Sequence, residues 1–448
     1  MALCLVDGLL GSHQMVFLFL YLQNYGISLV AYSLLENLSM GMMMFNPLFG
    51  FVTDRFALLG SKRKAYLVLA GCVGAAGYST AALTSWVSIP LGVVIGFQFV
   101  IEISNSFRAV VLDAMNVSIH NFRNAHAGSE KQMSTNSALM TVFGAKLIGK
   151  VLSNIFFGAV YYYFRSTFLF FNAFVALISV AIACWTVELT NSPSNGTGPR
   201  GSFSLGQSIR ISVARVREAR ISRLVLADFV SALSPNLEAG IKFFMVGVLK
   251  FTNTDFLTRM VFSEGFFLLG ILAMGTVLKK VSRKSIIRFV FASNVLWNLV
   301  LIVIINHYAS LFLPPFALMT LYSGIFALLL EMRIIPFVGV FMDNCPPGLE
   351  AFFLSILMLV VSIGRNIGGF FGTILFSLFS VTSTNFDNFD KIIYIRSAFL
   401  FIAFLVLLSA SIPERRITPE SPNTLAAEPQ ADILHKSAII GDQRLHES

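Results

Sequence analysis

Apolar segments long enough to cross a lipid bilayer follow one another along almost the whole chain, and no other feature constrains the fold as strongly. Each is about 20 residues or longer, the length that a helix needs to span the hydrocarbon core. Because lipid offers the backbone no hydrogen-bond partners, such segments are expected to form helices. Only 12% of the 448 residues are charged, whereas soluble domains carry about 25%. The chain is therefore expected to be an all-α polytopic membrane protein.

Twelve such segments are expected, and they fall into two groups of six. They lie at about residues 1–23, 28–52, 65–86, 91–117, 137–164, 167–187, 224–249, 256–278, 285–305, 311–342, 349–379 and 396–412. A stretch rich in Ser, Gly, Pro and Asn separates the two groups and marks a linker. The predicted domains are an N-terminal six-helix half (1–187), a cytoplasmic central loop (188–223), a C-terminal six-helix half (224–412) and a disordered cytoplasmic tail (413–448). This arrangement resembles the plan of major facilitator transporters.

Basic residues are confined to one set of loops. Lysines and arginines cluster after the second, sixth and eighth segments, whereas loops 24–27 and 84–90 contain none. Because basic loops stay in the cytoplasm, both termini are expected to be cytoplasmic. The same rule explains the formal net charge of +9 without a nucleic-acid partner. Within 208–223, arginines interspersed with Ile and Val fit either a basic amphipathic helix on the inner membrane surface or ordinary topogenic charge.

The chain carries no signature of an enzyme. Its four cysteines lie in or beside apolar segments at unrelated spacings, which suits neither a disulfide framework nor a metal site. The stretch 144–150 comes near an ATP-binding loop but lies inside an apolar segment, so ATP-driven pumping is not expected. We expect no cofactor, a monomer surrounded by membrane lipid, and the plasma membrane rather than an organelle. The first apolar segment follows Met1 almost directly, so we expect it to act as the insertion signal.

The loop after the second segment carries the most informative motif. Residues 45–71 read FNPLFGFVTDRFALLGSKRKAYLVLAG, with Asp54 and Arg55 followed by a basic triplet. The loop is similar to the one between helices 2 and 3 of major facilitator transporters, and more similar still to that of the folate-biopterin transporter family. A second motif, 345–351, reads CPPGLEA and resembles the Cys-Pro-x-Gly-x-Glu signature of the same family. Asp113-Ala114 resembles part of a further motif, but the upstream acid of that motif falls on Ala109.

The resemblance implies a cytoplasmic gate. In major facilitator transporters the loop aspartate packs near the start of helix 11, where the helix dipole favours an anion. We therefore expect Asp54, Arg55, Lys62, Arg63 and Glu350 to form a network that closes the outward-facing state. The alternative is that these residues only determine topology. Gly50 is expected to let a neighbouring helix approach closely near this loop.

The fourth segment carries candidates for coupling to an ion gradient. Glu102 and Asp113 are eleven residues apart, about three helical turns, so they share a face. Arg108 lies between them and could pair with either. Acids inside a membrane segment are costly, by about 2.5 to 3.5 kcal/mol, and are functional candidates for that reason. The alternative for Asp113 is a structural hydrogen bond.

Two further segments carry charges one turn apart. Lys146 and Lys150 share a face that could attract an anionic substrate, with snorkelling to the interface as the alternative. Glu238 and Lys242 stand in the favourable order for an intrahelical ion pair. They follow Pro235, which is expected to break the helix near a substrate site or gate.

The eleventh segment places Arg365 well inside apolar sequence. Its planar guanidinium suits a carboxylate, either the glutamate end of a folate or a protein acid such as Asp113 or Glu331. Glycines just after it allow close helix packing. Two other acids, Asp7 and Glu36, are expected to face the bundle interior.

Together these features predict a secondary transporter of the major facilitator type. The family resemblance implies that it carries folates or pterins by alternating access, with protons as a coupling ion. The alternatives are transport of another small organic anion or metabolite, and a transporter-like receptor or scaffold without transport. The missing acid of the helix 4 motif keeps the last alternative open.

Overall fold

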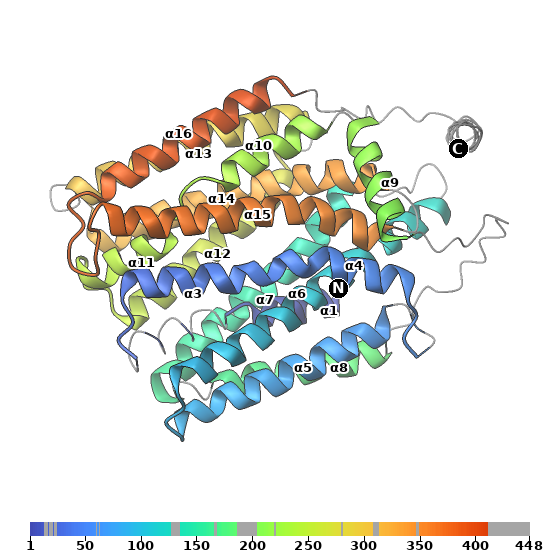
Figure 1. Cartoon of the computed structure of the whole chain (residues 1–448), viewed down its shortest axis with the longest axis horizontal. Coiled ribbons are helices and arrows are strands. Elements are labelled where there is room, and N and C mark those ends of the chain that lie inside the picture. Colours follow the sequence, from blue (N-terminus) through green and yellow to red (C-terminus); the bar gives the residue numbers. More distant parts are fainter. Residues whose placement is uncertain are drawn as a thin grey trace, which may run out of the picture.

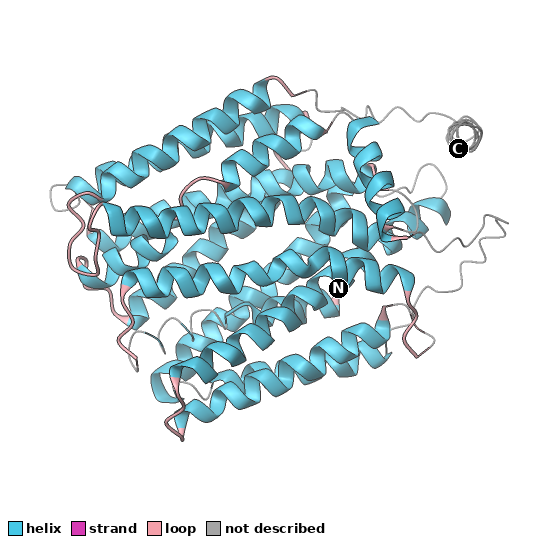
Figure 2. Cartoon of the chain, in the orientation of Figure 1, coloured by secondary structure: helices cyan, strands magenta, loops and turns pink. Residues whose placement is uncertain are grey.

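Long helices form from the apolar segments, because backbone in lipid must satisfy its own hydrogen bonds. The computed structural model describes residues 1–12, 17, 21, 25–59, 61, 63–126, 135–164, 168–185, 204–218, 221–278, 281–307, 313–345 and 349–410. Within these ranges the chain consists of helices and connecting loops (Figure 2). Nine of the described helices are long and apolar enough to cross a membrane. They are α5 (Lys64–Ala82), α6 (Leu91–His126), α7 (Thr135–Phe164), α8 (Phe168–Trp185), α12 (Asn253–Gly275), α13 (Arg283–His307), α14 (Pro315–Asp343), α15 (Glu350–Leu378) and α16 (Phe389–Leu408).

The other three expected spans are divided into shorter pieces. The first is represented by α1 (Ala2–Leu9) and the 3-10 turn η1 (Leu10–Ser12), and the second by α3 (Leu29–Gly41), η2 (Met42–Phe45) and α4 (Asn46–Arg55). The seventh comprises α10 (Ser222–Ala232) and α11 (Glu238–Gly247), and a further turn, η3 (Leu83–Ser85), follows α5. The twelve expected spans are therefore accounted for in the part of the chain that the structure describes.

The break in the seventh span is stabilised by α15. Pro235 has no backbone N–H to donate, so the helix cannot continue through it. The N–H of Asn236 instead donates to the carbonyl of Gly368, at 3.0 Å. A Cβ at Gly368 would lie 2.5 Å from the carbonyl oxygen of Ser234, and one at Gly372 would lie 2.6 Å from that of Asn236. The predicted close packing at these glycines is confirmed.

The two halves of the chain lie side by side with their helices running in a common direction (Figure 1). Helix α9 (Leu205–Glu218) lies across one end of this bundle, which we call the α9 end. Leu205, Ile209 and Val213 form an exposed apolar stripe along α9. The position of α9 on the inner membrane surface stays a prediction.

Two boundaries differ from the sequence expectation. Helix α16 begins at Phe389, seven residues before the predicted start, because Asp390 and Lys391 occupy its first turn rather than a preceding loop. Helix α6 continues to His126, past the apolar part of the segment, as a polar extension at the α9 end. Most of the linker and the predicted tail lie outside the described residues.

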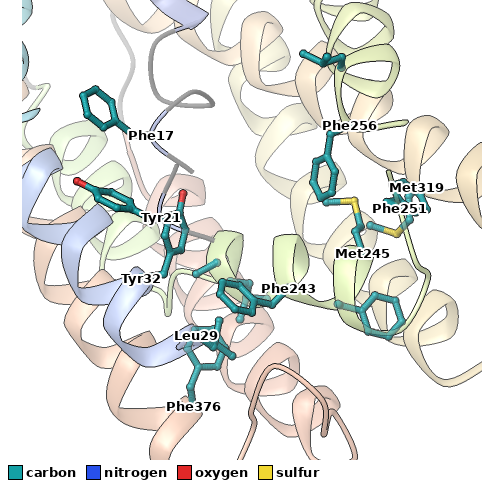
Figure 3. Close-up of a cluster of buried hydrophobic side chains, with 14 of the residues drawn as sticks. Phe17, Tyr21, Leu29, Tyr32, Phe243, Met245, Phe251, Phe256, Met319 and Phe376 are labelled. Atoms are coloured by element: carbon teal, nitrogen blue, oxygen red, sulfur yellow. The ribbon is translucent and has the colours of Figure 1, made fainter. Parts of the chain in front are cut away.

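Apolar side chains from both halves pack together at each end of the bundle. Away from the α9 end, one cluster includes Tyr32 of α3 and Phe243 of α11, whose ring centroids are 5.9 Å apart. Figure 3 shows these two residues close to one another, near Leu29 and Phe376. At the α9 end, Ala114 of α6 packs in one cluster with Ala351 of α15. The halves therefore touch on both sides of the bundle centre.

Candidate functional site

A lysine from one half is bound by carboxylates from both halves. Lys242 of α11 lies 2.6 Å from Glu36 of α3 and 2.9 Å from Glu238, one turn earlier on its own helix. Its ammonium also donates to the hydroxyl of Tyr32 at 3.4 Å. The side chain of Lys242 is 7% exposed, so its charge is compensated almost wholly by these groups. The predicted Glu238–Lys242 ion pair is confirmed, and Glu36 is the partner that sequence reasoning missed.

A cavity of about 340 Å³, open solvent included, lies next to this ion pair. Its lining comes from the first, second and fourth spans: Phe17, Tyr21, Tyr32, Glu36, Ser39, Met40, Gln98 and Glu102. The hydroxyl of Tyr21 donates to the side-chain oxygen of Gln98. Figure 3 shows Tyr21 and Tyr32 next to one another, with Phe17 above them. The cavity thus combines aromatic faces with two carboxylates, and Glu102, a predicted coupling acid, is one of them.

Four other charged side chains of the N-terminal half pair with one another. Arg108 lies 2.8 Å from Asp7 of α1, rather than pairing with Glu102 or Asp113. Lys146 of α7 lies 3.1 Å from Asp113 and 3.5 Å from Asp7. The expected interior position of Asp7 explains this, because α1 packs against α7 and also contacts α6. Lys146 and Asp113 therefore neutralise one another in this conformation.

The predicted cationic face of α7 is divided between the two halves. Whereas Lys146 binds acids of its own half, Lys150 lies 2.5 Å from Glu264 of α12 in the other half. One turn of helix separates the two lysines, but the long side chains reach different neighbouring helices. Glu264 was absent from the sequence-based candidates, although an acid within a membrane segment is itself a signal that could have found it.

Arg365 lies midway along α15 and is exposed. Among the described residues none accepts a hydrogen bond from it, so neither Asp113 nor Glu331 is its partner. It lies within electrostatic reach of Asp228 and Arg333, which are bonded to each other. The guanidinium is therefore available to a ligand, beside a buried pair that connects α10 and α14.

The loop aspartate occupies the start of α15. A side-chain oxygen of Asp54 accepts a hydrogen bond of 3.0 Å from the backbone N–H of Phe352, the third residue of that helix. The carboxylate thereby satisfies one of the N–H groups that a helix leaves unpaired at its first turn. The predicted approach at Gly50 is confirmed, because a Cβ there would lie 2.8 Å from the carbonyl oxygen of Ala351. Span 2 and span 11 are thus joined at the α9 end.

The other predicted gate residues differ in what they touch. Arg63 lies 3.7 Å from Asp54 and donates to the carbonyl of Ala114 at 2.9 Å and to Ser118. Arg55 stacks over the rings of Phe51 and Phe56, at 5.6 and 5.5 Å from the centroids. Lys62 lies outside the described residues. Glu350 begins α15, but its side chain is outside the described part.

An arginine at the corresponding place in the other half also binds the next helix but one, through a different acceptor. Just as Arg63 precedes α5 and binds the α9 end of α6, Arg283 begins α13 and binds Asp343 at the end of α14, at 2.6 Å. This match supports a parallel repeat of the two halves.

Comparisons with known proteins agree with this geometry. The sequence profile of the BT1 family matches residues 7–427. The folate-biopterin transporter of Synechocystis sp. is 24% identical over 454 residues, which cover 98% of this chain and 88% of the relative. Probable folate-biopterin transporter 7 of Arabidopsis thaliana is 23% identical over 369 residues, 80% of each chain.

Solved transporter structures share the fold. The nucleoside transporter NupG superposes with a TM-score of 0.62 at 13% identity, covering 92% of this chain and 98% of its own. The D-xylose-proton symporter gives a TM-score of 0.63 at 13% identity, covering 92% and 97%. At these identities the likeness shows the architecture alone, which is that of the major facilitator transporters.

Proposed function

The chain belongs to the BT1 family, and from this premise we propose that it carries folates or pterins across a membrane by alternating access. Its family and its structural neighbours make it a multi-pass membrane transporter rather than an enzyme. The substrate and the coupling ion are the proposed part. The relatives named as folate-biopterin transporters support the substrate class.

The observation that carries the proposal is the ion pair between Lys242 and Glu36 beside the cavity. It joins the two halves at 2.6 Å, and Glu36 is also part of the cavity wall. A ligand that binds Glu36 must compete with Lys242 for it. Binding would therefore loosen the contact between the halves, as alternating access requires.

The lining suits a flat, nitrogen-rich ring. A pterin presents adjacent N–H donors that a carboxylate can accept in a paired geometry, and Glu36 and Glu102 are candidates for this. Its ring can stack on Tyr21, Tyr32 or Phe17. Without open solvent the cavity offers only about 20 Å³, room for little more than one water molecule, so the ring can enter only after the lining side chains move apart.

For the glutamate end of a folate we propose Arg365. It is exposed, and no described acid is bonded to it. Five further residues are proposed to contact the substrate in a secondary role: Lys146, Lys150, Asp113, Glu238 and Lys242. Each of them is engaged in an ion pair in this conformation. A substrate would have to displace their present partners.

We also propose that the α9 end is cytoplasmic and that Asp54, with Arg55, Lys62, Arg63 and Glu350, forms the gate there. The hydrogen bond from Phe352 to Asp54 supports it. Proton coupling through Glu102 is better supported than coupling through Asp113. Glu102 is 6% exposed on the cavity wall, whereas the side chain of Asp113 is 53% exposed and paired with Lys146.

Uptake of labelled folic acid and biopterin by purified protein in liposomes, with and without a proton gradient, tests the proposal. We expect saturable uptake that the gradient accelerates. Lys242→Met should abolish uptake of both compounds, because it leaves Glu36 and Glu238 without their shared cation. Lys391→Met is the control and should leave uptake unchanged, because the ammonium of this lysine is hydrogen-bonded only to the exposed turn before α16 among the described residues. Folded protein that takes up neither compound would refute the substrate assignment.

A further inference from the structure

A carboxyl group is buried in the middle of the C-terminal half with no hydrogen-bond partner in the described part of the chain. Glu331 lies near the midpoint of α14, and the residue is 0% exposed. Among the described residues none donates a hydrogen bond to either of its side-chain oxygens. An ionised carboxylate in this position would lose its hydration and gain nothing in return, a cost that buried groups avoid by becoming neutral. The geometry therefore favours the protonated acid.

A second acid faces Glu331 from the adjacent helix. Glu264 of α12 lies within electrostatic reach of Glu331, and its side chain is 8% exposed. One of its oxygens lies 2.5 Å from Lys150, and the other has no hydrogen-bond partner in the described chain. Close packing encloses the site, since a Cβ at Gly270 would lie 3.2 Å from the Cβ of Glu331. Lys150 thus binds one acid of the pair, Glu264, and acts on Glu331 only through electrostatics.

Other charges on the surrounding helices have partners elsewhere. On α14 itself, Arg333 is bonded to Asp228. On α12, Arg259 donates to Ser323 at 2.7 Å. The basic residues of α13 whose contacts the structure describes lie towards its α9 end, where Arg283 binds Asp343. Glu238 of α11 is within electrostatic reach of Lys150 but is bonded to Lys242. Lys150 is therefore the cation that acts on both acids, by a direct ion pair with Glu264 and through electrostatics on Glu331.

We propose that Glu331 and Glu264 form a proton-binding site whose occupancy depends on Lys150. In this conformation Glu331 holds the proton, while Glu264 is ionised and paired with Lys150. Lys150 belongs to the N-terminal half and both acids belong to the C-terminal half, so the pair separates when the halves move apart. Water that enters between the halves can then hydrate Glu331 as a carboxylate, and the proton leaves to that side.

This site is separate from the substrate cavity. Neither acid nor Lys150 is part of the cavity lining, in contrast to Glu102. The transport role rests on the proposed function, because it uses alternating access. Proton binding itself does not depend on the proposed function, and it can be measured without any substrate.

Infrared spectroscopy of the purified full-length protein tests proton binding directly. At neutral pH, where exposed carboxyl groups are ionised, we expect a carboxylic-acid band that is smaller in Glu331→Gln by the contribution of one carboxyl group. Glutamine has the shape of the neutral acid, so the variant should fold. Asp255→Asn, which removes the carboxylate that caps α12, should leave the band unchanged. A band of equal size in wild type and Glu331→Gln would overturn the proposal.

Lys150→Met provides a second variant. Without the ammonium, the buried Glu264 loses its counter-ion and should also take up a proton, so the acid band should grow. An unchanged band would show that the lysine does not control the pair, and would overturn that part of the proposal even if Glu331→Gln failed to fold.

Transport gives the functional readout. Glu331→Gln should retain exchange of labelled for unlabelled substrate but lose accumulation driven by a proton gradient. If Glu331→Gln accumulates substrate as well as the wild type does, Glu331 has only a structural role and coupling through it is refuted. If wild-type protein transports neither folate nor pterin, the proposed function fails, while the infrared result still decides whether the site binds a proton.

Discussion

Replacing Asp54 by Asn should shift the protein towards a state that is open at the α9 end. The carboxylate joins span 2 to the first turn of α15 through its 3.0 Å hydrogen bond with the backbone of Phe352. Its side chain is 6% exposed, so solvent screens the contact only weakly. Because the two helices belong to different halves, this contact stabilises only conformations in which the α9 end is closed.

The size of this shift towards the open state follows from the interactions that asparagine keeps and those that it loses. Its side-chain oxygen can still accept the hydrogen bond, so about 1 to 1.5 kcal/mol of charge-assisted strength is lost rather than the whole bond. Loss of a negative charge at a helix N-terminus adds about 0.3 to 1 kcal/mol. The total of about 2 kcal/mol corresponds to a change of about 30-fold in the ratio of open to closed protein.

Distances between spin labels measure that ratio. Trp185, the last residue of α8, and Val277, just after the end of α12, are suitable positions, because they are 89% and 77% exposed and belong to different halves. The labels are placed on cysteines in a chain whose four native cysteines have been replaced. In Asp54→Asn the ratio of the longer distance, which marks the open state, to the shorter one should rise by about 30-fold. Transport should also slow.

Asp255→Asn is the matched control, since it removes a carboxylate that binds the first turn of its own helix. It should leave the distance distribution unchanged. An Asp54→Asn protein of normal thermal stability with the wild-type distribution would refute the gate. Loss of surface expression instead of a slower turnover would indicate that Asp54 acts on folding or topology.

Two further substitutions test the substrate site and the packing. Arg365→Ala should weaken uptake of a folate more than uptake of a bare pterin, because only the folate carries the glutamate carboxylates; equal loss for both would remove this assignment. Gly149→Ala should lower the thermal stability by about 1 to 3 kcal/mol of unfolding free energy, because its Cβ would lie 2.0 Å from the carbonyl oxygen of Leu5 on α1. Gly144→Ala, on the same helix with open space around it, should be tolerated, and equal melting temperatures for the two variants would contradict the close packing.

The helical plan of this chain could be predicted because hydropathy and loop charge are local properties. Each apolar segment must become a helix wherever it lies in the bundle, since the backbone has no other way to bond in lipid. The break at Pro235 is local in the same sense. The helix boundaries were less certain where polar residues continue a helix beyond its apolar part, as at the end of α6 and the start of α16.

Helix geometry predicts partners of charged residues only within one helix, whereas the contact of Asp54 with the start of α15 was expected from the motif resemblance. Glu238 and Lys242 are one turn apart, so their pairing follows from helix geometry alone. Glu36 reaches the same lysine from a helix about two hundred positions away in the chain, and nothing in its local sequence indicates that. The pairing of Arg108 with Asp7, rather than with an acid on its own helix, has the same origin.

Hydropathy and short motifs predict a membrane protein with twelve spans in two halves, a loop motif around Asp54, and acids that lipid would not tolerate unpaired. The packing of the helices sets which of those acids are neutralised by lysine or arginine, and it leaves Glu331 buried with no partner among the described residues. Periodicity places a residue on a face of its helix but does not say how that helix is rotated against its neighbours. That rotation is set by packing at sites such as Gly149, Gly270 and Gly368, where helices meet too closely for a side chain to lie between them.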